Sequence, residues 1–128
     1  NVYGHQLGLS NETQSMRVHA PSMTEMTNIG ATRLYGQVPE HITTEHVLRY
    51  GHEEVVQVTT LDSFDFPQVD FVKVDVEGAL DLVLEGAQQT IDRHRPVLAV
   101  EHSNQEPPLR LVEWGYRCMH VLPIHDLW

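Results

Sequence analysis

The alternation of hydrophobic and polar positions divides the chain into a weakly patterned first part and a strongly patterned second part. Residues 1–10 suit a strand that runs into a polar loop, and residues 14–20 alternate weakly, as in an exposed hairpin strand. Residues 21–52 contain prolines and glycines without a long periodic stretch. For that region we expect loops, short strands and one turn of helix near Glu45–Arg49. The range 1–55 thus predicts a strand, a hairpin and loops.

The pattern becomes regular after residue 55. Valines at positions 55, 56 and 58 form a β-branched run, and Thr60 is a suitable N-cap for a helical turn at Leu61–Phe64. Residues 69–76 are rich in valine and are bounded by a proline and a glycine. This composition favours a buried strand of a parallel sheet.

Residues 79–94 change to a helical period. Apolar side chains recur at i, i+3, i+4, i+7 and i+11, and form one stripe of an amphipathic helix: Leu80, Val83, Leu84, Ala87 and Ile91. A strand at 97–101, a helix at 107–113 and a strand at 116–122 follow. The segment 56–128 therefore predicts strand–helix–strand–helix–strand, an α/β sheet with flanking helices and two parallel strands.

Composition limits the kinds of partner. The 128 residues are enough for one domain. Eighteen acidic residues against eight Lys and Arg give a formal charge of −10, which repels nucleic acid and anionic membranes. We therefore expect neither as a partner. The single Cys118 forms no internal disulfide, and no apolar run is long enough to span a membrane. A reducing, cytoplasmic location is the expectation.

Ionisable side chains follow two of the predicted strands. Asp75 and Glu77 come after the first, and Glu101 and His102 come after the next. The carboxyl ends of parallel strands share one edge of a sheet, where such sheets bind ligands. We therefore expect these side chains at a ligand crevice. A partly buried Asp75 would have a raised pKa, suited to a general base. The alternative is a carboxylate that caps the following helix.

The neighbouring candidates also have structural alternatives. Glu77 suits the dipole of the first helical turn, and the pair after the second strand suits an ordinary polar loop entry. Lys73 lies inside an apolar strand. If both faces of the sheet are covered, its ammonium needs a partner such as Asp62 or Glu101. Otherwise Lys73 extends along the margin of the sheet.

A metal is the remaining chemical alternative. Candidate ligands follow the two strands: Asp75, Glu101, His102 and Asn104. The nine histidines show no ligand pair at a fixed spacing, so we predict no metal site.

The order of the short motifs resembles the FkbM methyltransferase family. The motifs are T-L-D at 60–62, K-V-D-V-E-G at 73–78, V-L-E-G-A at 83–87, R-P at 95–96, Glu101, and G-Y at 115–116. This resemblance implies a Rossmann-like class I sheet and S-adenosylmethionine as cofactor. It also implies O-methylation of a small molecule or sugar, with Asp75, Glu77, Glu101 and His102 as catalytic candidates.

The resemblance also places the chain within the family's domain. Residues 7–11 resemble the segment after the family's third strand, which implies that Gly8, Leu9 and Ser10 contact the cofactor together with Asp75. The family's glycine-rich loop would precede residue 1. The expectation is thus a partial sheet with its N-terminal strands missing and an exposed edge that promotes self-association. The alternatives are a non-catalytic α/β domain that binds no cofactor alone, and a metal-dependent enzyme on the same scaffold.

Overall fold

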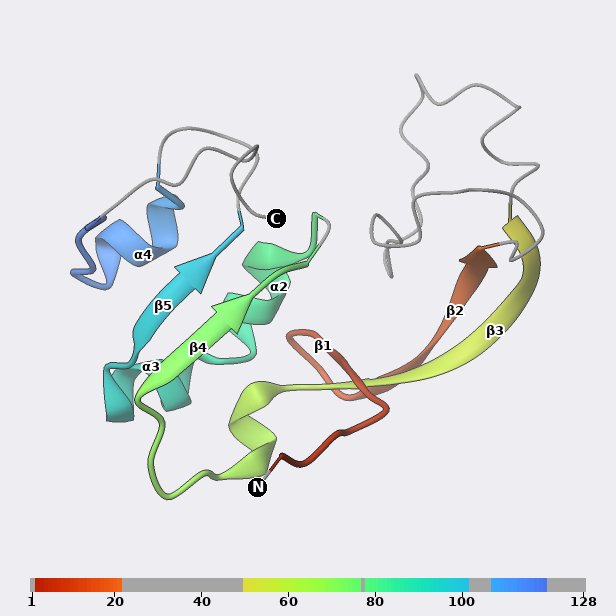
Figure 1. Ribbon diagram of the computed structural model, residues 1–128, viewed down its shortest axis with the longest axis horizontal. Coiled ribbons are helices and arrows are strands. Elements are labelled where there is room, and N and C mark those ends of the chain that lie inside the picture. The colour runs from red at the N-terminus through yellow and green to blue at the C-terminus, as the bar shows by residue number, and fades with distance from the viewer. Residues whose placement is uncertain (1, 22–49, 77, 102–106, 120–128) are drawn as a thin grey trace.

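The computed structural model describes residues 2–21, 50–76, 78–101 and 107–119 (Figure 1). A three-stranded sheet has the order β1-β3-β2, and a two-stranded sheet has the order β4-β5. The strands are β1 (Gly8–Leu9), β2 (Gln14–Pro21), β3 (Tyr50–Thr59), β4 (Phe71–Val74) and β5 (Val97–Val100). The expected combination of helices and strands is thus present. The helical turn expected near residues 45–49 lies outside the described residues.

The first sheet is a long β2–β3 ribbon that extends away from β4 and β5 (Figure 1). β2 is antiparallel to β3, and the short β1 is parallel to it with Gly8 opposite Val58. The strand expected over residues 1–10 is therefore confined to two residues. The weak alternation in β2 is confirmed, because Val18 is buried and Met16 is half-buried.

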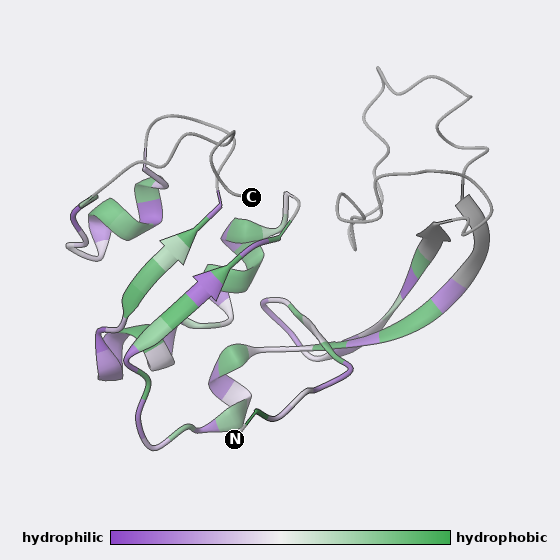
Figure 2. Ribbon diagram, viewed as in Figure 1, coloured by the Kyte–Doolittle hydropathy of each residue, from purple (hydrophilic) through white to green (hydrophobic). Residues whose placement is uncertain are grey.

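The second sheet pairs β4 and β5 in parallel, with Phe71 opposite Val97 and Val74 opposite Val100. Both strands are mostly hydrophobic (Figure 2). Val74 is buried, whereas Phe71 is 58% exposed and Val97 is 67% exposed. Because side chains alternate along a strand, only one face of β4 is covered by the described residues. The predicted strand and its parallel pairing are confirmed, whereas within β4 only Val74 is buried.

The single helix expected over residues 79–94 is divided into α2 (Leu80–Glu85) and α3 (Gln88–His94). The break lies at Gly86. A Cβ atom there would lie 2.0 Å from the main-chain oxygen of Ser10, so this position approaches the loop after β1 too closely for a side chain. The carbonyl of Gly86 accepts the N–H of Asp62 at 3.0 Å instead of continuing a helix.

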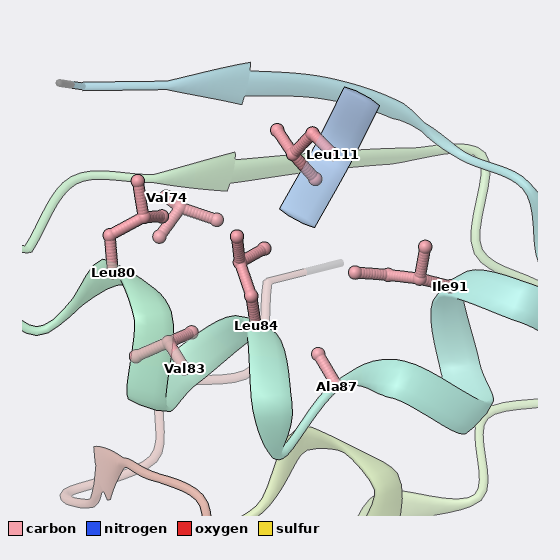
Figure 3. Packing of buried hydrophobic residues seen from close by; sticks show 7 residues of the cluster. All are labelled: Val74, Leu80, Val83, Leu84, Ala87, Ile91 and Leu111. Carbon is pink, nitrogen blue, oxygen red and sulfur yellow. The ribbon is translucent and has the colours of Figure 1, made fainter. Parts of the chain in front are cut away.

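The core lies between the second sheet and these helices (Figure 3). It combines the predicted stripe with one residue each from β4 and α4 (Leu109–Glu113): Val74, Leu80, Val83, Leu84, Ala87, Ile91 and Leu111. As predicted, the last helix ends before Gly115, which has φ 78°. Of the strand expected at 116–122, residues 116–119 have no regular structure and the rest lie outside the described residues.

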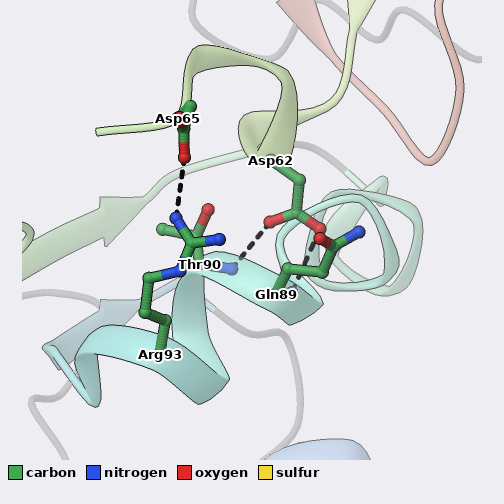
Figure 4. Close-up of polar contacts among 5 residues, drawn as sticks. All are labelled: Asp62, Asp65, Gln89, Thr90 and Arg93. Atoms are coloured by element: carbon green, nitrogen blue, oxygen red, sulfur yellow. Dashed lines mark hydrogen bonds and ion pairs between the residues drawn. The ribbon is translucent and has the colours of Figure 1, made fainter. Parts of the chain in front are cut away.

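A short 3₁₀ helix, η2 (Leu61–Phe64), connects the two sheets. The predicted cap is confirmed, because the N–H of Ser63 donates to the Thr60 hydroxyl at 3.2 Å. Asp62 accepts main-chain N–H groups at the start of α3, and Asp65 pairs with Arg93 at 2.7 Å (Figure 4). η2 is thus attached to α3 by side chains. No helix within the described ranges is long and apolar enough to cross a membrane.

Candidate functional site

Two carboxylates meet at the carboxyl edge of the second sheet. Asp75 follows β4 and Glu101 follows β5, and the N–H of Glu101 donates to the carbonyl of Val74 at 2.8 Å. The side chain of Glu101 is close enough to that of Asp75 to help lower its pKa, after the hydrogen bond from Lys73. The structure therefore brings these two sequence-predicted residues together. The other two, Glu77 and His102, lie outside the described residues.

Lys73 is the third charged group of this edge. Its Nζ atom lies 2.5 Å from Oδ2 of Asp75, and their side chains are 65% and 47% exposed. The expected partners were Asp62 and Glu101. Asp62 instead caps α3, whereas the charge of Glu101 contributes to the raised pKa of Lys73 after the hydrogen bond and charge of Asp75. Lys73 is thus an exposed partner of Asp75 and not a buried ion.

The predicted rise in the pKa of Asp75 is wrong. The hydrogen bond from Lys73, followed by the hydrogen bond with Glu101 and the charge of Lys73, lowers this pKa below its usual value. Burial acts in the opposite direction but is outweighed, because the side chain is about half exposed. Asp75 is therefore better suited to hold a positive charge than to accept a proton.

A cavity of about 190 Å³ lies beside β4 and includes Lys73 and Asp75 in its lining. The rest of the lining is apolar and comes from several elements, among them Leu9 of β1, Leu61 of η2 and Val72 of β4. Sites for small molecules are commonly about 300–1,000 Å³. The cavity therefore has room for part of a nucleoside-sized ligand.

The three residues expected to contact a cofactor occupy different environments. Leu9 lines the cavity that Asp75 also lines. Gly8 and Ser10 are not part of that lining. Ser10 is fully buried, its N–H donates to the carbonyl of Thr59 at 2.8 Å, and its hydroxyl donates to Asn11 at 3.1 Å. The structure thus brings one of the three to the cavity.

Two residues of this region were missed by the sequence reasoning. Lys73 was expected to pair with Asp62 or Glu101, or to extend along the margin of the sheet, although a spacing of two residues in a strand places it on the same face as Asp75. That spacing could have identified the pair. Leu61 contributes to the cavity through the turn at η2, and no sequence pattern indicates where that turn packs.

No group of three or more His, Cys, Asp or Glu side chains that could hold a metal occurs in the ranges that the structure describes. Two of the four ligands considered above, His102 and Asn104, lie outside those ranges.

The comparison with protein families gives one match. Residues 1–118 match the family described as "Methyltransferase FkbM domain", so the match covers most of the 128 residues. It includes every motif on which the resemblance was based. No curated protein and no solved structure matches the chain significantly.

Proposed function

Because the chain belongs to the FkbM methyltransferase domain family, we propose that it takes part in S-adenosylmethionine-dependent O-methylation of a small molecule or sugar. We also propose that β4, α2, α3 and β5 are part of a Rossmann-like sheet. The observation that carries the functional proposal is that Asp75 and Glu101 follow two paired parallel strands and so lie together at the carboxyl edge of that sheet. This is the edge at which α/β sheets bind ligands.

The residues at this edge fit the chemistry of that cofactor. S-adenosylmethionine supplies an electrophilic methyl carbon on a positively charged sulfur, and it also contains an ammonium group. Asp75 is ionised at neutral pH because its pKa is lowered, so it offers a negative charge to such a ligand. The apolar lining that includes Leu9 and Leu61 suits an adenine ring.

In the proposed mechanism, Asp75 positions the reacting groups, and Glu101 helps to keep the pKa of Asp75 low. Asp75 accepts the hydrogen bond of the acceptor hydroxyl or holds the positive charge of the cofactor, which aligns the reacting groups. S-adenosylmethionine would supply the methyl group to the acceptor hydroxyl, whose proton would then need an acceptor on the protein. We propose that this proton would pass to Glu101 or to His102, the two candidates that follow β5 in the sequence. Glu77 remains a further candidate from the sequence.

Calorimetry with S-adenosylmethionine tests the binding role. We expect the chain to bind the cofactor and Asp75→Asn to weaken binding about tenfold, since it removes a charge–charge contact. Asp70→Asn is the matched control, because Asp70 precedes β4 at the opposite end of the strand. Equal binding by the wild-type chain and Asp75→Asn would refute the role of this carboxylate.

Formation of S-adenosylhomocysteine with a set of hydroxylated small molecules and sugars tests the reaction. We expect Asp75→Asn to lower turnover at least about tenfold, within the usual contribution of a positioned acid or base. A protein that binds the cofactor but transfers no methyl group to any of these acceptors would contradict O-methylation.

The second candidate function is a non-catalytic α/β domain. The size of the cavity favours it, because about 190 Å³ is below the usual volume of a complete cofactor site. Absence of S-adenosylmethionine binding by the wild-type chain would support this candidate.

A further inference from the structure

Lys73 occupies a position where an uncharged residue would suit the strand better. β4 has the sequence Phe-Val-Lys-Val, and lysine is one of the residues depleted in strands. The residue opposite Lys73 on β5 is Ala99, which offers no charge. The ammonium instead contacts Asp75, with 2.5 Å between Nζ and Oδ2. Exposed ion pairs contribute little to stability, so stability alone does not account for a lysine here.

Three charged side chains meet where β4 and β5 end, and we call Lys73, Asp75 and Glu101 the charged edge. Lys73 and Asp75 are two residues apart and share one face of the strand. The N–H of Glu101 donates to the carbonyl of Val74 at 2.8 Å, which places Glu101 beside them. The hydrogen bond and charge of Asp75, and then the charge of Glu101, raise the pKa of Lys73. Two carboxylates and one ammonium leave the charged edge with one net negative charge.

This charge matches that of the cofactor in the proposed function. S-adenosylmethionine has one net positive charge, because its sulfonium and ammonium groups outnumber its single carboxylate. S-adenosylhomocysteine, the product, lacks the sulfonium charge and is neutral overall. The charged edge therefore balances the charge of the cofactor, and the product leaves it unbalanced.

We propose that Lys73 is a specificity-determining residue, which limits the charged edge to one net negative charge. The cofactor and a neutral hydroxyl acceptor then bind together in electrical balance, whereas a protonated amine adds a second positive charge. Unfavourable charge thus excludes the wrong acceptor. The inference rests on the proposed function, because it requires ligands to bind at Asp75. It adds the residue that selects hydroxyl acceptors over amines.

The short contact between Lys73 and Asp75 makes this selection effective. An atom that is hydrogen-bonded to Oδ2 of Asp75 lies about 2.8 Å from it, and hence within about 5–6 Å of Nζ of Lys73. Salt screens charges over about 8 Å at physiological ionic strength. A second positive group at this carboxylate is therefore repelled by Lys73 with incomplete screening.

Calorimetry with S-adenosylmethionine and S-adenosylhomocysteine tests the charge balance through the ratio of the two Kd values. Lys73→Met leaves two net negative charges, so its preference for the cofactor over the product should rise roughly three- to tenfold above that of the wild-type chain. Lys73→Gln removes the same charge with a polar side chain and should give the same change if Lys73→Met does not fold. Lys73→Arg keeps the charge and should preserve the wild-type ratio.

Arg93→Met is the matched control for this ratio. It also removes a cation from an exposed ion pair, the one with Asp65, and Arg93 precedes β5 at the end opposite to Glu101. Its ratio of Kd values should equal that of the wild-type chain. A purely structural role of Lys73 would weaken the binding of both compounds in parallel and leave the ratio unchanged.

Methyl transfer tests the choice of acceptor. At pH 7 an aliphatic amine is protonated, as the pKa of about 10.4 for lysine indicates. We expect the wild-type chain to use a hydroxylated acceptor in preference to the amine of the same carbon skeleton. Lys73→Met should reduce this preference, and Lys73→Arg should retain it.

The outcomes separate this inference from the proposed function. A wild-type chain that binds neither compound refutes both. If the wild-type chain binds the cofactor but the ratio of Kd values is unchanged in Lys73→Met and Lys73→Gln, only the role of Lys73 is refuted. The same conclusion follows if Arg93→Met changes the ratio equally, or if the amine is used as well as the hydroxylated acceptor.

Discussion

The carboxylate of Asp62 caps α3 by accepting the main-chain N–H of Thr90 at 2.8 Å. Its other oxygen accepts the N–H of Gln89 at 3.1 Å. Ala87, the residue that immediately precedes α3, provides no side-chain cap. A residue of η2 therefore satisfies donors that the helix leaves unpaired at its own start.

The first prediction concerns this cap. Asp62→Ala should lower the free energy of unfolding by about 0.5–2 kcal/mol, the usual cost of losing an N-cap side chain. Urea denaturation measures the change. Asp65→Ala is the control, because it removes an ion pair whose side chains are 82% and 56% exposed. Its expected cost is about 0–1 kcal/mol. A larger effect at Asp65 than at Asp62 would contradict this assignment.

The second prediction concerns the close approach of Gly86 to Ser10. Gly86→Ala would place a Cβ atom 2.0 Å from the Ser10 oxygen and 2.9 Å from its carbonyl carbon. Since main-chain atoms cannot yield as a flexible side chain does, we expect a loss of about 1–3 kcal/mol on unfolding by urea. Gly4→Ala should be nearly neutral, because no atom lies within 4 Å of the added carbon.

The third prediction concerns the core. Leu84 is 1% exposed and lies within the cluster shown in Figure 3. Leu84→Ala should lower the free energy of unfolding by about 2–5 kcal/mol, since it removes buried methyl groups and leaves a cavity. Leu109 is 72% exposed, so Leu109→Ala should change it by less than about 0.5 kcal/mol. Equal effects would show that the packing differs from the structure.

The fourth prediction concerns the pH dependence of stability. The hydrogen bonds of Lys73 and Glu101 lower the pKa of Asp75 in the folded state. The ionised carboxylate therefore favours folding above the unfolded pKa of about 3.9, and this contribution disappears as pH falls through the lower folded pKa. The stability difference between the wild-type chain and Asp75→Asn should be largest near neutral pH.

Urea unfolding between about pH 7 and about pH 2.5 measures that difference. The difference in the free energy of unfolding between the wild-type chain and Asp75→Asn should become smaller as the pH falls. Asp70→Asn makes the same chemical change just before β4 and is the matched variant. If the difference in the free energy of unfolding caused by Asp75→Asn instead grows as the pH falls, the pKa of Asp75 is not lowered in the folded state.

Local chemistry explains the elements that the sequence predicted well. A hydroxyl at Thr60 is sufficient to cap η2, and a glycine with positive φ at position 115 is sufficient to end α4. The valine-rich composition identified β4, and the apolar stripe identified the buried face of α2 and α3. In each case the residues that determine the element lie within it or next to it.

The remaining features depend on residues that are distant in the sequence. The predicted helix is divided where Gly86 approaches Ser10. The spacing of apolar residues along the helix cannot predict a contact with a residue so distant in the sequence. The lowered pKa of Asp75 comes first from the hydrogen bond of Lys73, a near neighbour in the sequence, and then from Glu101, which only the pairing of β4 with β5 brings close. The meeting of Asp75 with Glu101 was nevertheless predictable, because the carboxyl ends of parallel strands share one edge.

The break at Gly86 has a consequence for folding. It leaves α2 with six residues and α3 with seven, whereas isolated helices shorter than about 12–15 residues are only marginally stable in water. Neither segment can serve as a preformed nucleus, so both have to become ordered together with the strands against which they pack. A synthetic peptide of residues 79–95 should therefore show little helical circular dichroism, although residues 80–85 and 88–94 are helical in the intact chain.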